Sequence, residues 1–243
     1  MPKRLKFNWS SLDRQSLADI FQPAYTEIVN KKLKPEQLHR LLAKQVKNAL
    51  PVRVHKKIDA SVEHGLVYIG GCYYSDRDKS REICIEINFC YNPFDEFIVI
   101  DRARFKRMCY VLADVVLHEI IHMRQYRRRK FKEIPDYDSN AEMDELRIEQ
   151  SYYGCTDEID AYSFNIACEL LDRFKGDVNK VTEYIGKKHR RGHLKSHSLR
   201  SYLKVFNYDH DHPIIKRLRK RVVRYLPHAV QGKPYRNKDW IDR

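Results

Sequence analysis

The 243-residue chain lacks the features that mark several large classes of protein. No apolar run approaches the roughly 18 residues that a membrane-spanning helix needs, and residues 1–15 contain no apolar stretch typical of secretory signals. With only eight Gly and nine Pro, the composition is neither collagen-like nor of low complexity. We therefore expect a folded cytoplasmic protein without a membrane segment, with a hydrophobic content of 42% that suffices for a core.

The cysteines lack the close spacing of a CxxC pair. The six residues are scattered between positions 72 and 168. We therefore expect buried or free thiols, as in proteins of a reducing compartment.

The chain has almost no charge excess outside its last quarter. Residues 187–243 contain 17 Lys/Arg and 4 Asp/Glu, whereas the remaining 186 residues contain 30 and 29. Tyr and His are interspersed among these cations, a composition that suits contact with nucleic-acid phosphates. The alternatives are an acidic partner, or packing on the acidic segment 133–172, which contains 12 Asp/Glu and one Arg.

Hydrophobic patterning predicts an α+β protein with a small antiparallel or mixed sheet. Alternating, β-branched and aromatic residues indicate an antiparallel hairpin over 66–74 and 81–91, with a polar turn between the strands and 52–58 as a third strand. We expect three regions: an N-terminal helical segment over 1–50, a core over 51–176, and a basic helical region over 177–243.

A long helix is expected after the hairpin. Asp101 is its predicted N-cap, the stretch 104–129 contains no Gly or Pro, and its apolar residues follow a 3.6-residue period. Residues 135–150 form an acidic, weakly patterned connection. The next helix is expected to be capped by Thr156 and to end at residues 175–176. Other helices are expected at 10–49, 177–188, 197–207 and from Pro213 onward.

The long helix contains the sequence HEIIH at residues 118–122. Residues four apart lie on one helix face, so His118 and His122 can present two imidazole nitrogens to one metal ion. Glu119 is rotated by about 100° and can reach a water on that ion without binding the ion itself. Random placement of the chain's 11 His and 14 Glu would produce this motif only about 0.03 times, so its presence favours a zinc site.

A catalytic zinc ion needs a third protein ligand and an open position for water. The best candidate stretch is TDEIDAYSFNIACELL (156–171), where acids open a helix whose apolar face can pack against the HExxH helix and present a carboxylate. The residues alone leave alternatives open: Asp160, Glu142, Glu145, Glu149, His189, His193, His197, His210 and His212.

Together, HEIIH and EIDAYSFNIACELL resemble the gluzincin class of zinc metallopeptidases. The chain is most similar to the small ImmA/IrrE-type enzymes, whose second motif runs Glu-x-x-Ala-x-x-Phe with Leu-Leu shortly after. Here these positions are Glu158, Ala161, Phe164, Leu170 and Leu171, and the resemblance covers roughly residues 66–175.

The resemblance implies Zn²⁺ bound by His118, His122 and Glu158, with Glu119 as the catalytic base and acid. It also implies a zincin-like core, in which a small sheet packs on the HExxH helix, with extra N- and C-terminal helices. The edge strand of that sheet, expected at ICIEINF (83–89), would lie beside the cleft and pair with an extended peptide.

Four further residues are candidates for supporting roles. Asp160 and Asp114 are placed to orient an imidazole, and Asp160 is also the alternative ligand already named. Tyr152 and Tyr153 are candidate donors to an oxyanion.

The intact motif makes a zinc metalloendopeptidase acting on a protein or peptide the leading hypothesis. One alternative is a nucleic-acid-associated or virion structural protein that retains a zincin scaffold. Another is a protease recruited to nucleic acid, as in SprT-like metallopeptidases, for which a distal His would replace Glu158 as ligand.

Overall fold

The structure is a computed structural model that describes residues 7–133 and 144–234. The chain forms two compact units, Met1–Met123 and Arg124–Arg243. The boundary between them falls inside one helix, α5 (Arg102–Arg128). All described strands belong to the first unit, and the described elements of the second are helices, so the predicted α+β class is confirmed. The expected three regions divide the chain at other points than these two units do.

The first unit contains a three-stranded sheet in the order β2-β4-β3. Strands β3 (Val67–Tyr73) and β4 (Ile85–Tyr91) are antiparallel, and β2 (Arg53–Ile58) joins the other side of β4 in parallel. The predicted hairpin and the third strand are therefore confirmed. The connection between β3 and β4 contains a short helix, α4 (Ser75–Lys79), where we expected only a turn.

The expected position of the edge strand is wrong. Strand β4, which contains most of ICIEINF, is the central strand, and all seven of its residues are buried. In the sequence, the polar residues Glu86 and Asn88 alternate with apolar ones, as in a half-exposed strand. In the structure both are buried, and β4 is paired with β2 on one side and with β3 on the other. The edges are β2 and β3.

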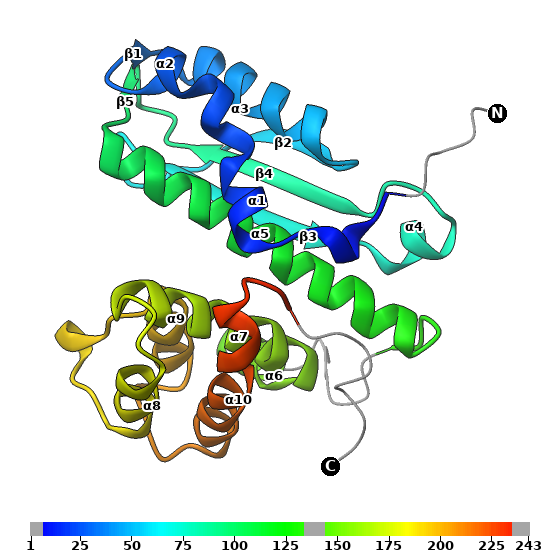
Figure 1. Cartoon of the computed structure of the whole chain (residues 1–243), viewed down its shortest axis with the longest axis vertical. Helices are drawn as coiled ribbons and strands as arrows, with labels where there is room; N and C mark the ends of the chain where they lie inside the picture. Colours follow the sequence, from blue (N-terminus) through cyan, green and yellow to red (C-terminus); the bar gives the residue numbers. More distant parts are fainter. Residues whose placement is uncertain (1–6, 134–143, 235–243) are drawn as a thin grey trace. The chain divides into compact units, whose positions relative to one another are not determined.

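Helices cover one face of this sheet. The side chains of Ile87 and Phe89 face the core. There the centroid of the Phe89 ring lies 6.2 Å from that of Phe21 and 5.9 Å from that of His39. Figure 1 shows α3 (Pro35–Ala49) and α5 running along the sheet. The expected helical stretch 10–49 is confirmed apart from a short two-residue strand. Its remaining elements are η1 (Trp9–Ser11), α1 (Arg14–Ala18), η2 (Asp19–Ala24), α2 (Tyr25–Ile28) and β1 (Lys32–Leu33), which pairs with β5 (Ile98–Val99).

The second unit is a cluster of helices around α7 (Thr156–Arg173). Helix α7 is buried along most of its length and packs most extensively against α10 (Pro213–Val230). Around them lie α8 (Val178–Gly186) and α9 (His197–Val205) at the expected positions. The short helix η3 (Arg191–His193) between them was not expected.

The chain between α5 and α7 differs from expectation. Residues 145–150, expected in a connection, lie in helix α6 (Glu145–Gly154), whose N-cap Asp144 accepts a hydrogen bond from the Arg147 amide. Residues 134–143, including the candidate ligand Glu142, lie outside the described residues. Thr156 is the first helical residue of α7 rather than its cap, which is Cys155.

The expectation about the cysteines is met. All six cysteines are free thiols, and only Cys72 is more than marginally exposed. Within the described ranges, no helix has the length and apolar content needed to cross a bilayer.

Candidate metal centre

Helix α5 places the two motif histidines side by side. Its start is fixed as predicted, because the Asp101 carboxylate accepts a hydrogen bond of 2.8 Å from the Arg104 amide. One helical turn separates His118 from His122, so their rings lie 4.7 Å apart and their Nε2 atoms 3.0 Å apart. Two nitrogens bound to one tetrahedral zinc ion at about 2.0–2.1 Å would lie roughly 3.3 Å apart. The spacing therefore suits a shared ion.

The last turns of α5 hold the start of α7. Arg129, just after the helix, makes two hydrogen bonds of 2.7 and 2.6 Å to the Asp157 carboxylate. Gln125 donates a third, of 3.1 Å, to the Asp157 carbonyl oxygen. Both Gln125 and Asp157 are buried, so these bonds are shielded from water. The residue after Asp157 is Glu158.

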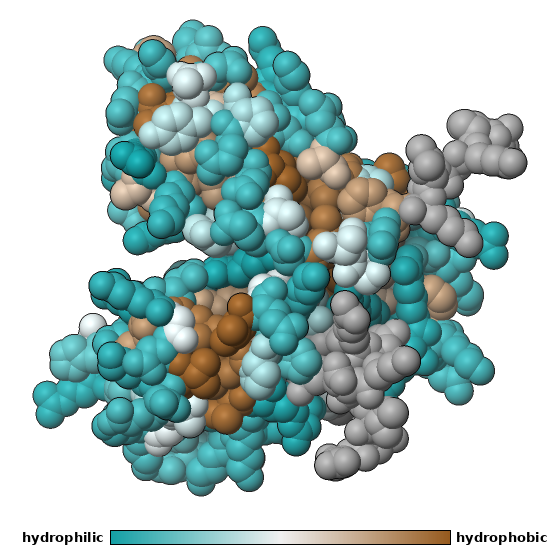
Figure 2. All heavy atoms as spheres, viewed as in Figure 1, coloured by the Kyte–Doolittle hydropathy of each residue, from teal (hydrophilic) through white to brown (hydrophobic). Residues whose placement is uncertain are grey.

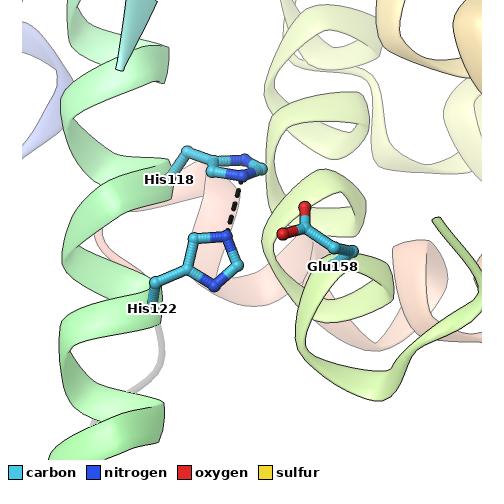
Figure 3. A group of neighbouring side chains, drawn as sticks. All are labelled: His118, His122 and Glu158. Carbon is cyan, nitrogen blue, oxygen red and sulfur yellow. Dashed lines mark hydrogen bonds between the residues drawn. The ribbon is translucent and has the colours of Figure 1, made fainter. Parts of the chain in front are cut away.

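His118, His122 and Glu158 form a group that fits a metal ion. One donor atom from each side chain lies within 4.8 Å of the others, and all three residues are buried. Figure 3 shows both imidazoles of α5 and the carboxylate of α7 turned toward one another. Two imidazole nitrogens and one carboxylate oxygen are the ligand set of many catalytic zinc sites, which keep a fourth position open. No other such group occurs within residues 7–133 and 144–234.

Glu119 lies against the edge strand β3. A Cβ atom added to Gly71 would lie 2.7 Å from Glu119 Oε1, 2.8 Å from Glu119 Cγ and 2.7 Å from Val115 Cγ1. Real Cβ contacts are almost never this short, so only glycine lets the β3 backbone come so close to α5 here. The strand thus passes directly beside the carboxylate that the motif assigns as base.

Tyrosines surround Glu158 within the helical unit. Burial raises the pKa of Tyr126, Tyr153 and Tyr202, and the negative charge of Glu158 raises the pKa of each further. Of the two predicted oxyanion donors, Tyr152 is 40% exposed and Tyr153 is half-buried, with its ring centroid 4.9 Å from that of Tyr202. Their predicted role stays a prediction.

The two predicted supporting acids each have an arginine partner. Arg14 binds Asp114 with two hydrogen bonds of 2.6 and 2.9 Å. Arg221 Nε lies 2.6 Å from the buried Asp160 carboxylate. Burial nevertheless raises the pKa of Asp160 to about 7, although the charge of Arg221 lowers it.

The alternative ligands are placed elsewhere in the structure. Glu145 and Glu149 lie on α6 and are exposed. His189 and His210 hydrogen bond to backbone carbonyls at 2.7 and 2.9 Å. His212 caps α10, and its Nδ1 accepts a hydrogen bond from the Ile214 amide.

Comparison with known proteins adds no relative. No family model, curated protein or solved structure matches the chain.

Three residues with structural roles near this group were missed in the sequence. Gly71 had a readable signal, because glycine inside a strand often marks a close approach of the backbone. Gln125 lies seven residues after His118, two helical turns along the same face, which also could have been read. The contact of Arg129 with Asp157 joins residues 28 apart and has no local signal.

Proposed function

We propose that this chain is a zinc-dependent metallopeptidase. The observation that carries the proposal is the convergence of the His118, His122 and Glu158 donor atoms within 4.8 Å, with Glu119 one residue along the same helix. This order of residues, with a mixed sheet beside the HExxH helix, also supports a zincin-like core of the gluzincin type.

The side chains suit hydrolysis of a peptide bond. A zinc ion held by this group would polarise the scissile carbonyl and lower the pKa of a bound water toward about 7. Glu119 would accept the proton of the attacking water and pass it to the leaving amine. Glu119 is buried, so the electrostatic interactions of its carboxylate are screened less than they would be in water.

Strand β3 offers a place for an extended substrate. It is one edge of the three-stranded sheet, and no further described strand pairs with its outer side. A peptide that adds to such an edge gains backbone hydrogen bonds whatever its side chains are. Because Gly71 lies beside Glu119, a peptide paired with β3 would pass close to the base. The proposed substrate is therefore an extended segment of a protein or peptide.

The metal site is tested by zinc content. Wild type, purified without added metal or tag, should contain one zinc per chain, and Glu158→Ala much less. Glu145→Ala is the matched control, since it removes an exposed acid that was itself an alternative ligand. Zinc retained in Glu158→Ala would reject this ligand set, and no zinc in wild type after incubation with zinc would reject the site.

Catalysis is tested separately with Glu119→Gln. This variant should bind zinc and melt like the wild type, but should not cleave an unfolded protein substrate such as casein. If zinc-loaded wild type cleaves no peptide in a broad library, the alternative of a binding protein with a zincin scaffold is favoured. The exposed cations of the C-terminal region are the observation that supports this alternative.

A further inference from the structure

The helical unit carries a concentration of positive charge that the proposed peptidase does not use. Residues 187–220 contain 11 Lys/Arg and only two acids, Asp209 and Asp211. They connect α8 to α9, form α9 and its following turn, and open α10.

Part of the basic region packs on the acidic segment 133–172, which is one of the alternatives that the sequence left open. Arg221 on α10 pairs with the buried Asp160 on α7, and Arg217 donates a hydrogen bond of 2.5 Å to the Gly154 carbonyl oxygen. These contacts explain the cations on that face of α10. On the loops at the end of the unit, Lys187 pairs with Glu183, and Lys188 and Lys216 pair with Asp211. The remaining loop cations, Arg190, Arg191 and Lys195, have no acidic partner among these pairs.

Two loops of the unit are joined into one surface. The loop 187–196 touches the loop 207–212 where His210 Nε2 lies 2.9 Å from the His189 carbonyl oxygen. Arg219 on α10 donates hydrogen bonds to the Lys187 carbonyl oxygen, at 3.0 Å, and to His210 Nδ1, at 2.6 Å. We call this the basic loop surface; its cations are Lys187, Lys188, Arg190, Arg191, Lys195, Lys216, Arg219 and Lys220.

Two of these cations lie over aromatic rings. The Arg191 guanidinium lies 3.9 Å from the centre of the Tyr208 ring. Lys195 Nζ lies 4.4 Å from the centre of the Phe174 ring. Such contacts reduce the side-chain entropy that a charged group loses when it binds an anion. The surface is therefore better prepared for a polyanion than a set of freely moving lysines.

The residue composition of the surface favours nucleic acid over a lipid bilayer as its partner. A surface that inserts into a bilayer has exposed apolar side chains beside its cations. No large hydrophobic residue between positions 187 and 220, a range that the structure describes completely, is exposed. Figure 2 shows hydrophilic side chains over the end of the unit where the loop after α8 projects. Exposed cations with His193 and His197 exposed beside them suit contact with a phosphodiester backbone.

We propose that the basic loop surface binds the phosphate backbone of nucleic acid without sequence specificity. The proposal does not depend on the metal centre, so Glu119→Gln should bind nucleic acid as the wild type does. If both activities hold, the surface would bring the peptidase to proteins bound on nucleic acid.

Fluorescence anisotropy with a labelled 30-base-pair DNA duplex, at several salt concentrations, tests the proposal. The test variant is Arg190→Gln/Arg191→Gln/Lys195→Gln. The matched control is Lys31→Gln/Lys44→Gln/Lys47→Gln, which removes three exposed cations from the first unit and the same net charge. Each phosphate contact adds about 0.9 to the slope of log affinity against log salt concentration.

We expect the test variant to lose at least tenfold in affinity at about 0.1 M salt, with a slope smaller by about 2–3, and the control to stay near the wild type. If the triple variant does not fold, Arg190→Gln alone, at an exposed residue, should lower the slope by about 1. Single-stranded DNA and RNA of equal length distinguish the kind of nucleic acid.

Three outcomes would overturn the proposal. The first is no wild-type binding to any nucleic acid at 50 mM salt. The second is an equal loss in the control variant, which would indicate only net charge. The third is equal or tighter binding to polyglutamate or to phosphatidylserine vesicles, which would indicate an acidic protein or a membrane as partner.

Discussion

The close approach of strand β3 to helix α5 at Gly71 leads to a sharp prediction about two adjacent glycines. Gly71→Ala places a methyl group 2.7 Å from both Glu119 Oε1 and Val115 Cγ1. At Gly70, one residue earlier on the same strand, the nearest atom to an added Cβ is Tyr68 Cε1, at 3.3 Å. Gly70→Ala is therefore a matched control with the same chemical change in the same strand.

The two substitutions should have opposite or very different effects on stability. Neither glycine has a positive φ angle, so alanine at either position reduces the freedom of the unfolded chain and gains about 0.4–1 kcal/mol. At Gly71 the overlap adds a cost of about 1–3 kcal/mol, because the branched Val115 side chain has few other rotamers on a helix. At Gly70 the 3.3 Å contact with the Tyr68 ring offsets part of the gain. We therefore expect Gly71→Ala to lower the free energy of unfolding by about 1–2 kcal/mol and Gly70→Ala to change it by less than about 0.5 kcal/mol.

Urea unfolding at neutral pH, followed by circular dichroism, measures this difference. Activity provides a second measurement if the peptidase proposal holds. Displacement of Glu119 by about 1 Å should lower kcat by about a hundredfold, while zinc content should be unchanged. Equal unfolding midpoints for Gly71→Ala and the wild type would refute the close packing of β3 on α5. An equal loss in Gly70→Ala would show that glycine matters there for a different reason.

The remaining predictions concern an ion pair, a histidine and metal removal. Arg129→Met should lower the free energy of unfolding, measured by urea titration, by about 2–3 kcal/mol, because it leaves the Asp157 carboxylate, whose side chain is 5% exposed, without this partner. Arg104→Met, in an exposed pair, should lower it by less than about 0.5 kcal/mol. Equal losses in the two variants would contradict this. Burial lowers the pKa of His210, and the guanidinium of Arg219 lowers it further. The stability contributed by neutral His210 is therefore present above pH about 6.5 and is lost as the pH falls below that value. His210→Gln should therefore show a shallower loss of urea midpoint between pH 7.5 and 5.5, and parallel curves would reject the assignment. A chelator should lower the Tm of zinc-loaded wild type but leave that of Glu158→Ala unchanged.

The elements with strong local signals were predictable. Helix α5 combines a capping Asp101, a regular apolar period and no helix breaker, and its start and length match expectation. The hairpin of β3 and β4 was equally clear, because both stretches of alternating, β-branched and aromatic residues and the polar segment between them lie within about 25 residues of sequence. The HExxH spacing fixed two nitrogens on one helix face for the same local reason.

Features that depend on distant parts of the chain were not predictable. Whether β4 is an edge or a centre depends on β2, which pairs with it in parallel from about 30 residues away. Asp114 stands one turn before His118, which suggested a role beside the imidazole. Arg14, 100 residues earlier, binds it with two hydrogen bonds, and no local pattern announces that contact.

The three acids that open α7 show how the structure distinguishes roles that the sequence leaves mixed. Any acid in a first helical turn complements the helix dipole, so composition alone does not separate Asp157, Glu158 and Asp160. Successive residues are rotated by about 100°, and the three carboxylates therefore leave the helix in different directions. One meets Arg129 and another meets Arg221, each at 2.6 Å. The third is the one that lies with the two histidines, which is the physical reason to propose Glu158 as the ligand and to expect Asp157 and Asp160 to hold the helix in place.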